Sequence, residues 1–195
     1  MIVAFSTSCH LAGVALLDEN GAVIGASTSE ASMAASGACL KLLAELLTRH
    51  GSNLGEASLF AADLGPGSFT GVKVGVTLAK VLGLACGVAV AGAESFDLID
   101  PRKTVVMPSK RGEFFVRRVG SPPFRSRELP SEPFVGFGPG ITEPVYPSAE
   151  RFAGLLPSLQ RMRPEHLLPH HMLEPSISQP KKPFAQRGPG AQAGC

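Results

Sequence analysis

The chain has 195 residues, of which 44% are hydrophobic, and its mean hydropathy is +0.18, enough apolar material for a buried core in one or two small domains. Its four cysteines stand far apart without a C-x-x-C pair, which argues against a zinc site and a disulfide framework. The net charge is +2, but residues 1–100 hold 4 Lys and Arg against 9 Asp and Glu, whereas residues 101–195 hold 14 against 7. The basic second half suits an acidic partner or RNA.

The first hundred residues predict a β-β-β-α-β-α-β order. Short apolar runs predict strands at residues 2–5, 12–17, 22–27, 58–62 and 88–90, and Asp18-Glu19-Asn20-Gly21 predicts a hairpin turn. Helices are predicted from Met33 to His50 and from Val72 to about Cys86. This order predicts an α/β fold with a mixed sheet and helices packed on it.

A change in composition marks a boundary near Ile99-Asp100-Pro101. Pro66 is the only proline before that point, and the other 16 of the 17 prolines follow it. We therefore expect one unit over residues 1–100 and a second over residues 101–174, with strands at 104–107, 113–119 and 134–137 and a short helix near 149–156. Residues 175–195 show no periodicity and predict a loose, basic, proline-rich tail.

The most informative motif is a glycine loop that follows the apolar run 58–62 and opens a helix. It consists of Gly65, Pro66, Gly67, Ser68, Phe69, Thr70 and Gly71. Such a turn exposes backbone N–H groups to an anion or to another backbone. The loop is not a P-loop, because no Gly-Lys-Ser/Thr follows, and it departs from the Rossmann fingerprint at Thr70. We expect Ser68 and Thr70 to hydrogen-bond the backbone of the loop itself.

Both predicted helices carry surfaces that need a packing partner. Leu40, Leu43 and Leu47 share one face of the first helix, and other apolar residues beside them make that face wider than one partner requires. In the second helix, small residues recur every fourth position at Gly71, Gly75, Ala79, Gly83 and Gly87. Each glycine inside a helix costs about 1 kcal/mol, so close approach of another backbone is implied, either from the chain's own sheet or from another protein. We predict a partner-binding surface made of Leu40, Leu43, Leu47, Gly75, Ala79 and Gly83.

No catalytic or metal-binding constellation is evident in the sequence. No histidine is identifiably placed to activate Ser68 or Thr70. His166, His170 and His171 form the only histidine cluster, and Pro169 breaks any helix between them, so solvated loop histidines are expected rather than a metal site. The N-terminus lacks the basic region of a signal peptide, and Lys73 and Lys80 interrupt the apolar stretch 71–93, which predicts a soluble, cytoplasmic protein without a membrane partner.

The glycine loop with the start of its helix, residues 65–75 and Lys80, resembles the TsaB (YeaZ) family. Residues 2–8 resemble the first strand and turn of that family, and residues 110–115 and 134–138 add weaker matches. The resemblance covers most of residues 1–120. It implies the actin-like ATPase (ASKHA) fold, with an N-terminal mixed-sheet lobe and an abbreviated second lobe.

The resemblance also implies a function. TsaB-like proteins are non-catalytic scaffold subunits that bind TsaD, together with the ATPase TsaE, in threonylcarbamoyl transfer to the tRNA adenosine next to the anticodon. ATP and metal are then expected on the partner subunits, and this chain meets the tRNA indirectly. One departure is notable, because Ser6 stands where the family usually has an aspartate, and a hydroxyl cannot replace a carboxylate as a ligand for a hard cation. A second is Pro108, in place of the aspartate of an Asp-Ala-Arg-Arg-like turn, which leaves Lys110 and Arg111 either as a solvated hairpin tip or as an RNA phosphate contact.

Three other functions stay open on the sequence alone. The first is a small actin-like ATPase or kinase that uses the glycine loop for phosphate, against which Ser6 argues. The second is a peptidase homologue of the M22 type, against which the absence of paired histidines on the first helix argues. The third is a degenerate homodimer without TsaD binding, which would use the same apolar surface as a TsaD complex.

Overall fold

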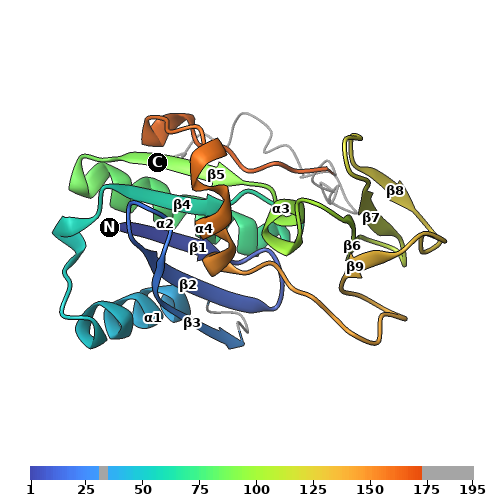
Figure 1. Ribbon diagram of the computed structural model, residues 1–195, viewed down its shortest axis with the longest axis horizontal. Coiled ribbons are helices and arrows are strands. Elements are labelled where there is room, and N and C mark those ends of the chain that lie inside the picture. Colours follow the sequence, from blue (N-terminus) through green and yellow to red (C-terminus); the bar gives the residue numbers. More distant parts are fainter. Residues whose placement is uncertain (31–34, 173–195) are drawn as a thin grey trace, which may run out of the picture.

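The computed structural model describes residues 1–30 and 35–172, which form two lobes side by side (Figure 1). The larger lobe is built on a five-stranded sheet of order β3-β2-β1-β4-β5, and the smaller lobe on a four-stranded sheet of order β8-β7-β6-β9. This confirms the expected α/β fold with a mixed-sheet first lobe and a smaller second lobe, and the sheet of the second lobe is mixed as well. The predicted tail at residues 175–195 lies outside the described residues.

The sheet of the first lobe is mixed, as the predicted element order requires. Its strands are β1 (Ile2–Ser6), β2 (Leu11–Leu17), β3 (Val23–Glu30), β4 (Leu59–Asp63) and β5 (Ala89–Ala93). Strand β1 pairs antiparallel with β2 and parallel with β4, and β5 continues the parallel part. The β2–β3 turn contains the predicted Asn-Gly pair, with Gly21 at φ +89° and the Asp18 carboxylate accepting from two backbone N–H groups.

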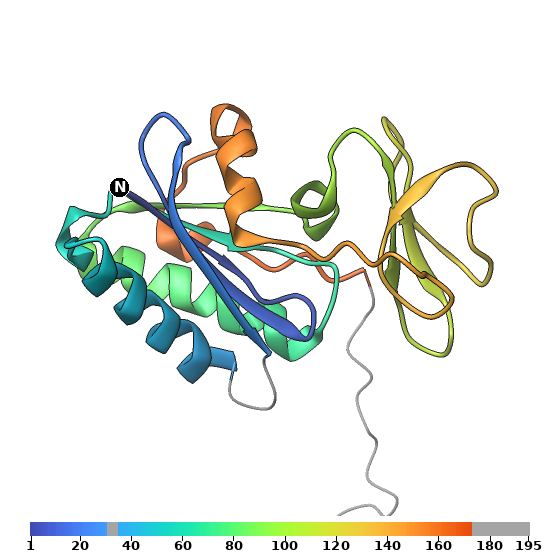
Figure 2. The same ribbon diagram turned by 60° about the horizontal axis from the view of Figure 1, so that its bottom comes forward.

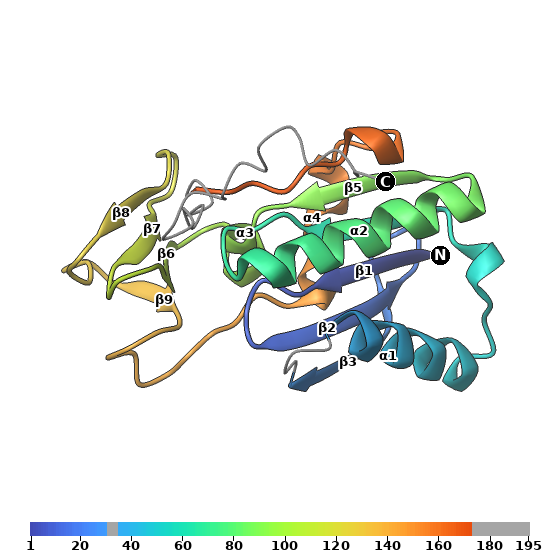
Figure 3. The same ribbon diagram turned by 180° about the vertical axis from the view of Figure 1, so that it is seen from behind.

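Helices cover both faces of this sheet. Helices α1 (Ala35–Arg49) and α2 (Phe69–Cys86) lie next to one another on one face (Figure 3), where β1 contributes Val3 and Phe5 to the core. The opposite face carries η2 (Ala149–Arg151), α4 (Phe152–Leu155) and η3 (Leu156–Ser158), and it buries Ile2 and Ala4 (Figure 2). Because both faces are covered, every residue of β1 is buried, which explains the unbroken apolar run at the N-terminus.

Helix α2 has the length and apolar composition of a membrane-spanning helix, with a mean hydropathy of 1.5 over 18 residues. In this structure it packs lengthwise on β4 and β1, as the core helix of a globular domain does. Its C-terminal end is closed by Gly87 in the left-handed conformation at φ +68°.

The short helix α3 (Ser95–Ile99) leads from β5 to the second lobe. That lobe contains β6 (Thr104–Pro108), β7 (Phe114–Arg117), β8 (Phe124–Ser126) and β9 (Phe134–Gly136). One face of its sheet packs on α3 through Val105, Met107 and Phe115, and the other buries Val106, Phe114 and Val116 under the 129–141 segment. Helix α3 and strand β8 were not predicted, because five and three residues are too short to show a period.

After β9 the chain returns to the first lobe. Ser148 N–H donates to the carbonyl of Leu98 at 3.3 Å, so the chain leaves the first lobe and comes back to it at adjacent points. Residues 149–172 then run over the first lobe, where Phe152 and Leu167 are fully buried in the cores on its two faces. The assignment of all residues 101–174 to a second lobe is therefore wrong for this stretch. The short helix near 149–156 forms as predicted, but its apolar side chains complete the core of the first lobe.

Candidate functional site

The glycine loop packs against the turn between β1 and β2. Ser68 N–H donates to the carbonyl of Ser8 at 2.7 Å, and the Thr7 hydroxyl donates to the carbonyl of Gly71 at 2.7 Å. Gly67, at φ +158°, and Gly71 leave no room for a Cβ, because one would collide with the carbonyls of Ser8 and Thr7. The backbone that approaches the loop is therefore the chain's own β1–β2 turn, and the loop joins two neighbouring segments of the first sheet.

Ser68 is the N-cap of α2. Its hydroxyl accepts a hydrogen bond from the N–H of Gly71 at 3.2 Å, as expected for a serine that bonds its own loop. At the same end of the helix, the Lys73 ammonium lies 3.9 Å from the centre of the Phe69 ring, and the His171 ring stacks on that ring at 4.8 Å. The pKa of His171 is lowered by partial burial and by the neighbouring Lys73 charge, so neutral imidazole is favoured at this place.

A buried carboxylate below the loop was not identified from the sequence. Asp63, the last residue of β4, is fully buried. Its Oδ2 accepts from the hydroxyls of Ser6 at 3.1 Å and Ser8 at 2.5 Å, and its Oδ1 accepts from Ser95 Oγ at 2.5 Å and from Gly65 N–H at 2.9 Å. Burial raises the pKa of Asp63, and the four hydrogen bonds oppose that rise. Asp63 thus holds β1, the β1–β2 turn, the glycine loop and α3 together.

Ser6 lies directly beside this carboxylate. Ser6 is the position where the resembling family usually has an aspartate, and here the carboxylate comes from the neighbouring strand β4 instead. All four of its bonds come from protein donors, and no surface of Asp63 reaches the cleft. The arrangement is therefore that of a structural hub and not of an open cation site.

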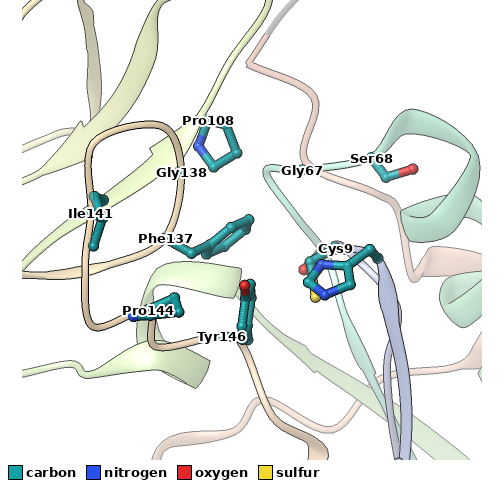
Figure 4. Close-up of a pocket in the computed structure, with 11 residues that line it drawn as sticks. Cys9, Gly67, Ser68, Pro108, Phe137, Gly138, Ile141, Pro144 and Tyr146 are labelled. Atoms are coloured by element: carbon teal, nitrogen blue, oxygen red, sulfur yellow. The ribbon is translucent and has the colours of Figure 1, made fainter. Parts of the chain in front are cut away.

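A cavity of about 610 Å³ lies between the two lobes, next to the glycine loop (Figure 4). The first lobe lines it with Ser8, Cys9, His10, Gly67 and Ser68, and the second with Pro108, Phe137, Gly138, Ile141, Pro144 and Tyr146. The Tyr146 ring meets the His10 ring edge-on at 4.7 Å and the Phe137 ring at 4.9 Å, so aromatic contacts bridge the lobes. Among the described residues, no Lys, Arg, Asp or Glu lines the cavity, so these residues offer no fixed charge to a polyphosphate or a cation.

Cys9 and the histidines do not assemble into a catalytic group. Burial raises the pKa of the Cys9 thiol to about 11, which keeps it protonated and unreactive at neutral pH. The backbone N–H of His170 donates to the carbonyl of Leu64, and its ring Nδ1 lies 3.2 Å from Glu94 Oε1. His170 therefore belongs to the segment that packs beside the glycine loop and is not a free loop histidine. Among residues 1–30 and 35–172, no three His, Cys, Asp or Glu side chains come close enough to hold a metal ion.

The predicted partner-binding surface needs correction. Leu43 is only 4% exposed and lies in the core under α1, whereas Leu40, three residues earlier, is 46% exposed. Leu47 is half-buried and packs against the same core. The expectation that Leu43 faces a partner is wrong, because α1 turns Cys39, Leu42, Leu43 and Leu46 toward the sheet.

The small-residue stripe of α2 also faces inward. A Cβ on Gly75 would lie 2.6 Å from Thr7 Oγ1, and one on Gly83 would lie 2.6 Å from Val90 Cγ1, while Ala79 is fully buried. Gly75, Ala79 and Gly83 therefore serve close packing of α2 on its own sheet and are not available to another protein. The outward side of α2 instead exposes Val81 and Leu84, neither of which was predicted to bind a partner.

Comparison with known proteins agrees with this geometry. The family model described as tRNA N6-adenosine threonylcarbamoyltransferase (TsaD) matches residues 22–99, and no curated protein sequence matches the chain. YeaZ from Pseudomonas aeruginosa superposes with a TM-score of 0.71 at 20% identity, over 87% of this chain and 98% of that chain. An uncharacterised protein described as similar to peptidase YeaZ from Pseudomonas aeruginosa superposes with a TM-score of 0.74 at 17% identity, over 87% and 97%. The chain therefore has the fold of the YeaZ proteins, and the resemblance that its glycine loop indicates is confirmed at the level of that fold.

Proposed function

We propose that this chain is a TsaB-like scaffold subunit that binds a TsaD-like enzyme through α1 and α2 and supports threonylcarbamoyl transfer to tRNA. The YeaZ-like fold supports the assignment, and so does the TsaD family match over residues 22–99. In this proposal the chain acts in the cytoplasm and is itself non-catalytic. ATP and metal are handled by the TsaD-like subunit and a TsaE-like ATPase.

The observation that carries the proposal is the outward face of the two-helix layer. Leu40 on α1 and Val81 and Leu84 on α2 are large aliphatic side chains exposed on helices that lie next to one another (Figure 3). These three residues, here called the outer apolar face, replace the inward-facing residues that the sequence pattern suggested. Large aliphatic groups exposed on two neighbouring helices provide apolar area that another protein could cover.

The cleft supports a non-catalytic role. Ser68 acts as a helix cap and the Cys9 thiol is protonated at neutral pH, so the described residues of the cavity wall include no activated nucleophile. The Asp63 carboxylate lies below the wall, where four donors bond it. These observations also weigh against the peptidase and the ATPase alternatives. A homodimer through the outer apolar face stays an alternative, since two copies could cover the same side chains.

Val81→Arg tests the proposal. The side chain is 54% exposed, so the free chain should tolerate the change, while an interface would enclose an unpaired guanidinium at a cost of several kcal/mol. We expect co-purification with the TsaD-like subunit from the same host to be lost, with an unchanged circular dichroism spectrum. Val119→Arg is the matched control, because Val119 is 57% exposed and lies in the second lobe.

The outcomes separate the alternatives. If folded Val81→Arg still co-elutes with the TsaD-like subunit, docking uses another surface and the proposal is wrong. The wild-type chain could instead fail to bind the TsaD-like subunit but form a dimer, detected by light scattering, that Val81→Arg abolishes. In that case the outer apolar face serves self-association.

A further inference from the structure

The second lobe carries a concentration of positive charge that the scaffold role does not use. Residues 101–130 contain eight Lys and Arg but only two Glu, whereas the first hundred residues carry an excess of acidic groups. Some of these cations have structural roles. Arg117 is the clearest case, because it bonds Asp97 and the carbonyls of Phe96 and Asp100.

Four of the others gather at the tip of the β6–β7 hairpin. Glu113 closes the turn through backbone bonds to Lys110 and Ser109, and its carboxylate lies 3.1 Å from Arg125 and 3.7 Å from Arg127. Lys110 and Arg111 lie in the same turn and are exposed. Lys110, Arg111, Arg125 and Arg127 are here called the basic tip, and the Glu113 carboxylate, which pairs with Arg125 and Arg127, leaves this set with a positive excess.

The backbone at the basic tip is strained. Arg111 has φ +59°, and it is the only non-glycine residue with a positive φ within the described part of the chain. A residue other than glycine is uncommon in this left-handed conformation, and glycine would occupy it more easily. An arginine at this position is thus not explained by the needs of the turn, which points to a role for its guanidinium.

An exposed aromatic ring lies on the same hairpin pair. Phe124 begins the edge strand β8, and the Arg118 guanidinium lies 5.1 Å from the centre of its ring. Strand β8 is an edge strand of the described sheet, where it pairs with β7, and it stands at the outer end of the second lobe (Figure 1). Single-stranded RNA is recognised by two kinds of group. Guanidinium groups bind its phosphates, and aromatic rings stack on its unpaired bases.

We propose that the basic tip and Phe124 form a direct RNA contact, and that its ligand is the tRNA on which the complex acts. The identity of the RNA rests on the proposed function, but the charge and the ring belong to this chain alone. The acidic first lobe repels the phosphate backbone and so directs RNA to the second lobe. RNA is favoured over an anionic membrane because the described part of the second lobe exposes arginines and a phenylalanine ring rather than a broad aliphatic patch.

The test is fluorescence anisotropy of a labelled, unmodified tRNA transcript with the full chain, at several salt concentrations. Arg111→Gly with Arg127→Gln should weaken binding at least fivefold and lower the slope of log K against log salt by about 2. Arg111→Gly relieves the strained φ, so the melting temperature should stay level or rise, which separates lost binding from lost folding. The control is Arg102→Gln, whose side chain is 88% exposed against 87% for Arg127, and it should leave the affinity unchanged.

Three results would overturn the proposal. The first is a wild-type chain that binds no tRNA even at 50 mM salt. The second is a double variant that binds tRNA as the wild type does. The third is binding to phosphatidylserine vesicles that depends on the basic tip in the absence of such tRNA binding, which would assign the surface to a membrane. Val81→Arg should keep full tRNA affinity, so failure of the scaffold proposal and failure of the RNA proposal give different results.

Discussion

A pair of substitutions on α1 tests the division between its buried and exposed faces. Leu43→Arg places a guanidinium in the core between α1 and the sheet, where Leu43 is 4% exposed. The lost burial of the leucine is worth about 2 kcal/mol, and an unpaired buried charge adds several more. The sum of about 5 kcal/mol or more is comparable with the whole stability of a typical domain. Leu40→Arg adds the same charge to the same helix at a site that is 46% exposed, and it should change stability by no more than about 0.5 kcal/mol.

Thermal unfolding followed by circular dichroism distinguishes these two variants. At about 2–4 °C per kcal/mol for a chain of this size, Leu43→Arg should lower the melting temperature by about 10–20 °C or leave the chain unfolded. Leu40→Arg should melt within about 2 °C of the wild type. A folded Leu43→Arg variant with a near-normal melting temperature would show that this leucine does not belong to the core, and that α1 is turned differently on its sheet.

Two further predictions concern the site and the α2 packing. Asp63→Ala should lower the free energy of unfolding by about 3 kcal/mol or more, because it leaves three hydroxyls and one N–H without their acceptor. Asp63→Asn should lower it by about 1 kcal/mol, because the hydroxyls of Ser6 and Ser8 can rotate to accept from the new amide. Burial raises the pKa of Asp63 in the folded state above its unfolded value of about 3.9. The free energy of unfolding of the wild type relative to Asp63→Asn should therefore be greatest below the unfolded pKa and should fall as the pH rises through the folded pKa. Urea titrations at several pH values that give the same difference in unfolding free energy would contradict this. Gly83→Ala should destabilise the fold by about 1–3 kcal/mol, because its Cβ would lie 2.6 Å from Val90. Gly37→Ala on α1 should raise the melting temperature, because among the described residues no atom outside the adjoining helix backbone would lie within 4 Å of its Cβ. Equal effects of the two changes would show that α2 does not pack closely on β5.

The sequence predicted the strands and long helices well because each buries a continuous or periodic set of apolar residues. It could not orient α1, since six leucines and cysteines over two adjoining faces fit more than one rotation about the helix axis, and the sheet decides which one is buried. The glycine stripe was recognised as a close contact, but spacing alone does not say which backbone approaches. The role of Asp63 could not be predicted, because a single acidic residue at the end of an apolar strand belongs to no motif. Its four hydrogen-bond donors also come from segments up to 57 residues away in the sequence.

The hydrogen bond between Ser148 and Leu98 has a consequence for how the molecule is divided. The second lobe is a loop-like insertion whose two ends meet at one place, so the first lobe is a discontinuous domain that needs residues from both sides of it. A fragment ending at Ile99, where the family match also ends, would lack Phe152 and Leu167 and leave apolar surface open on both faces of its sheet. Replacing residues 100–147 by a short linker would span two points that already touch, but it would uncover Phe96 and Ile99, which the second lobe buries. The first lobe is therefore assembled from two separate stretches of the chain, residues 1–99 and 148–172, and its core needs both.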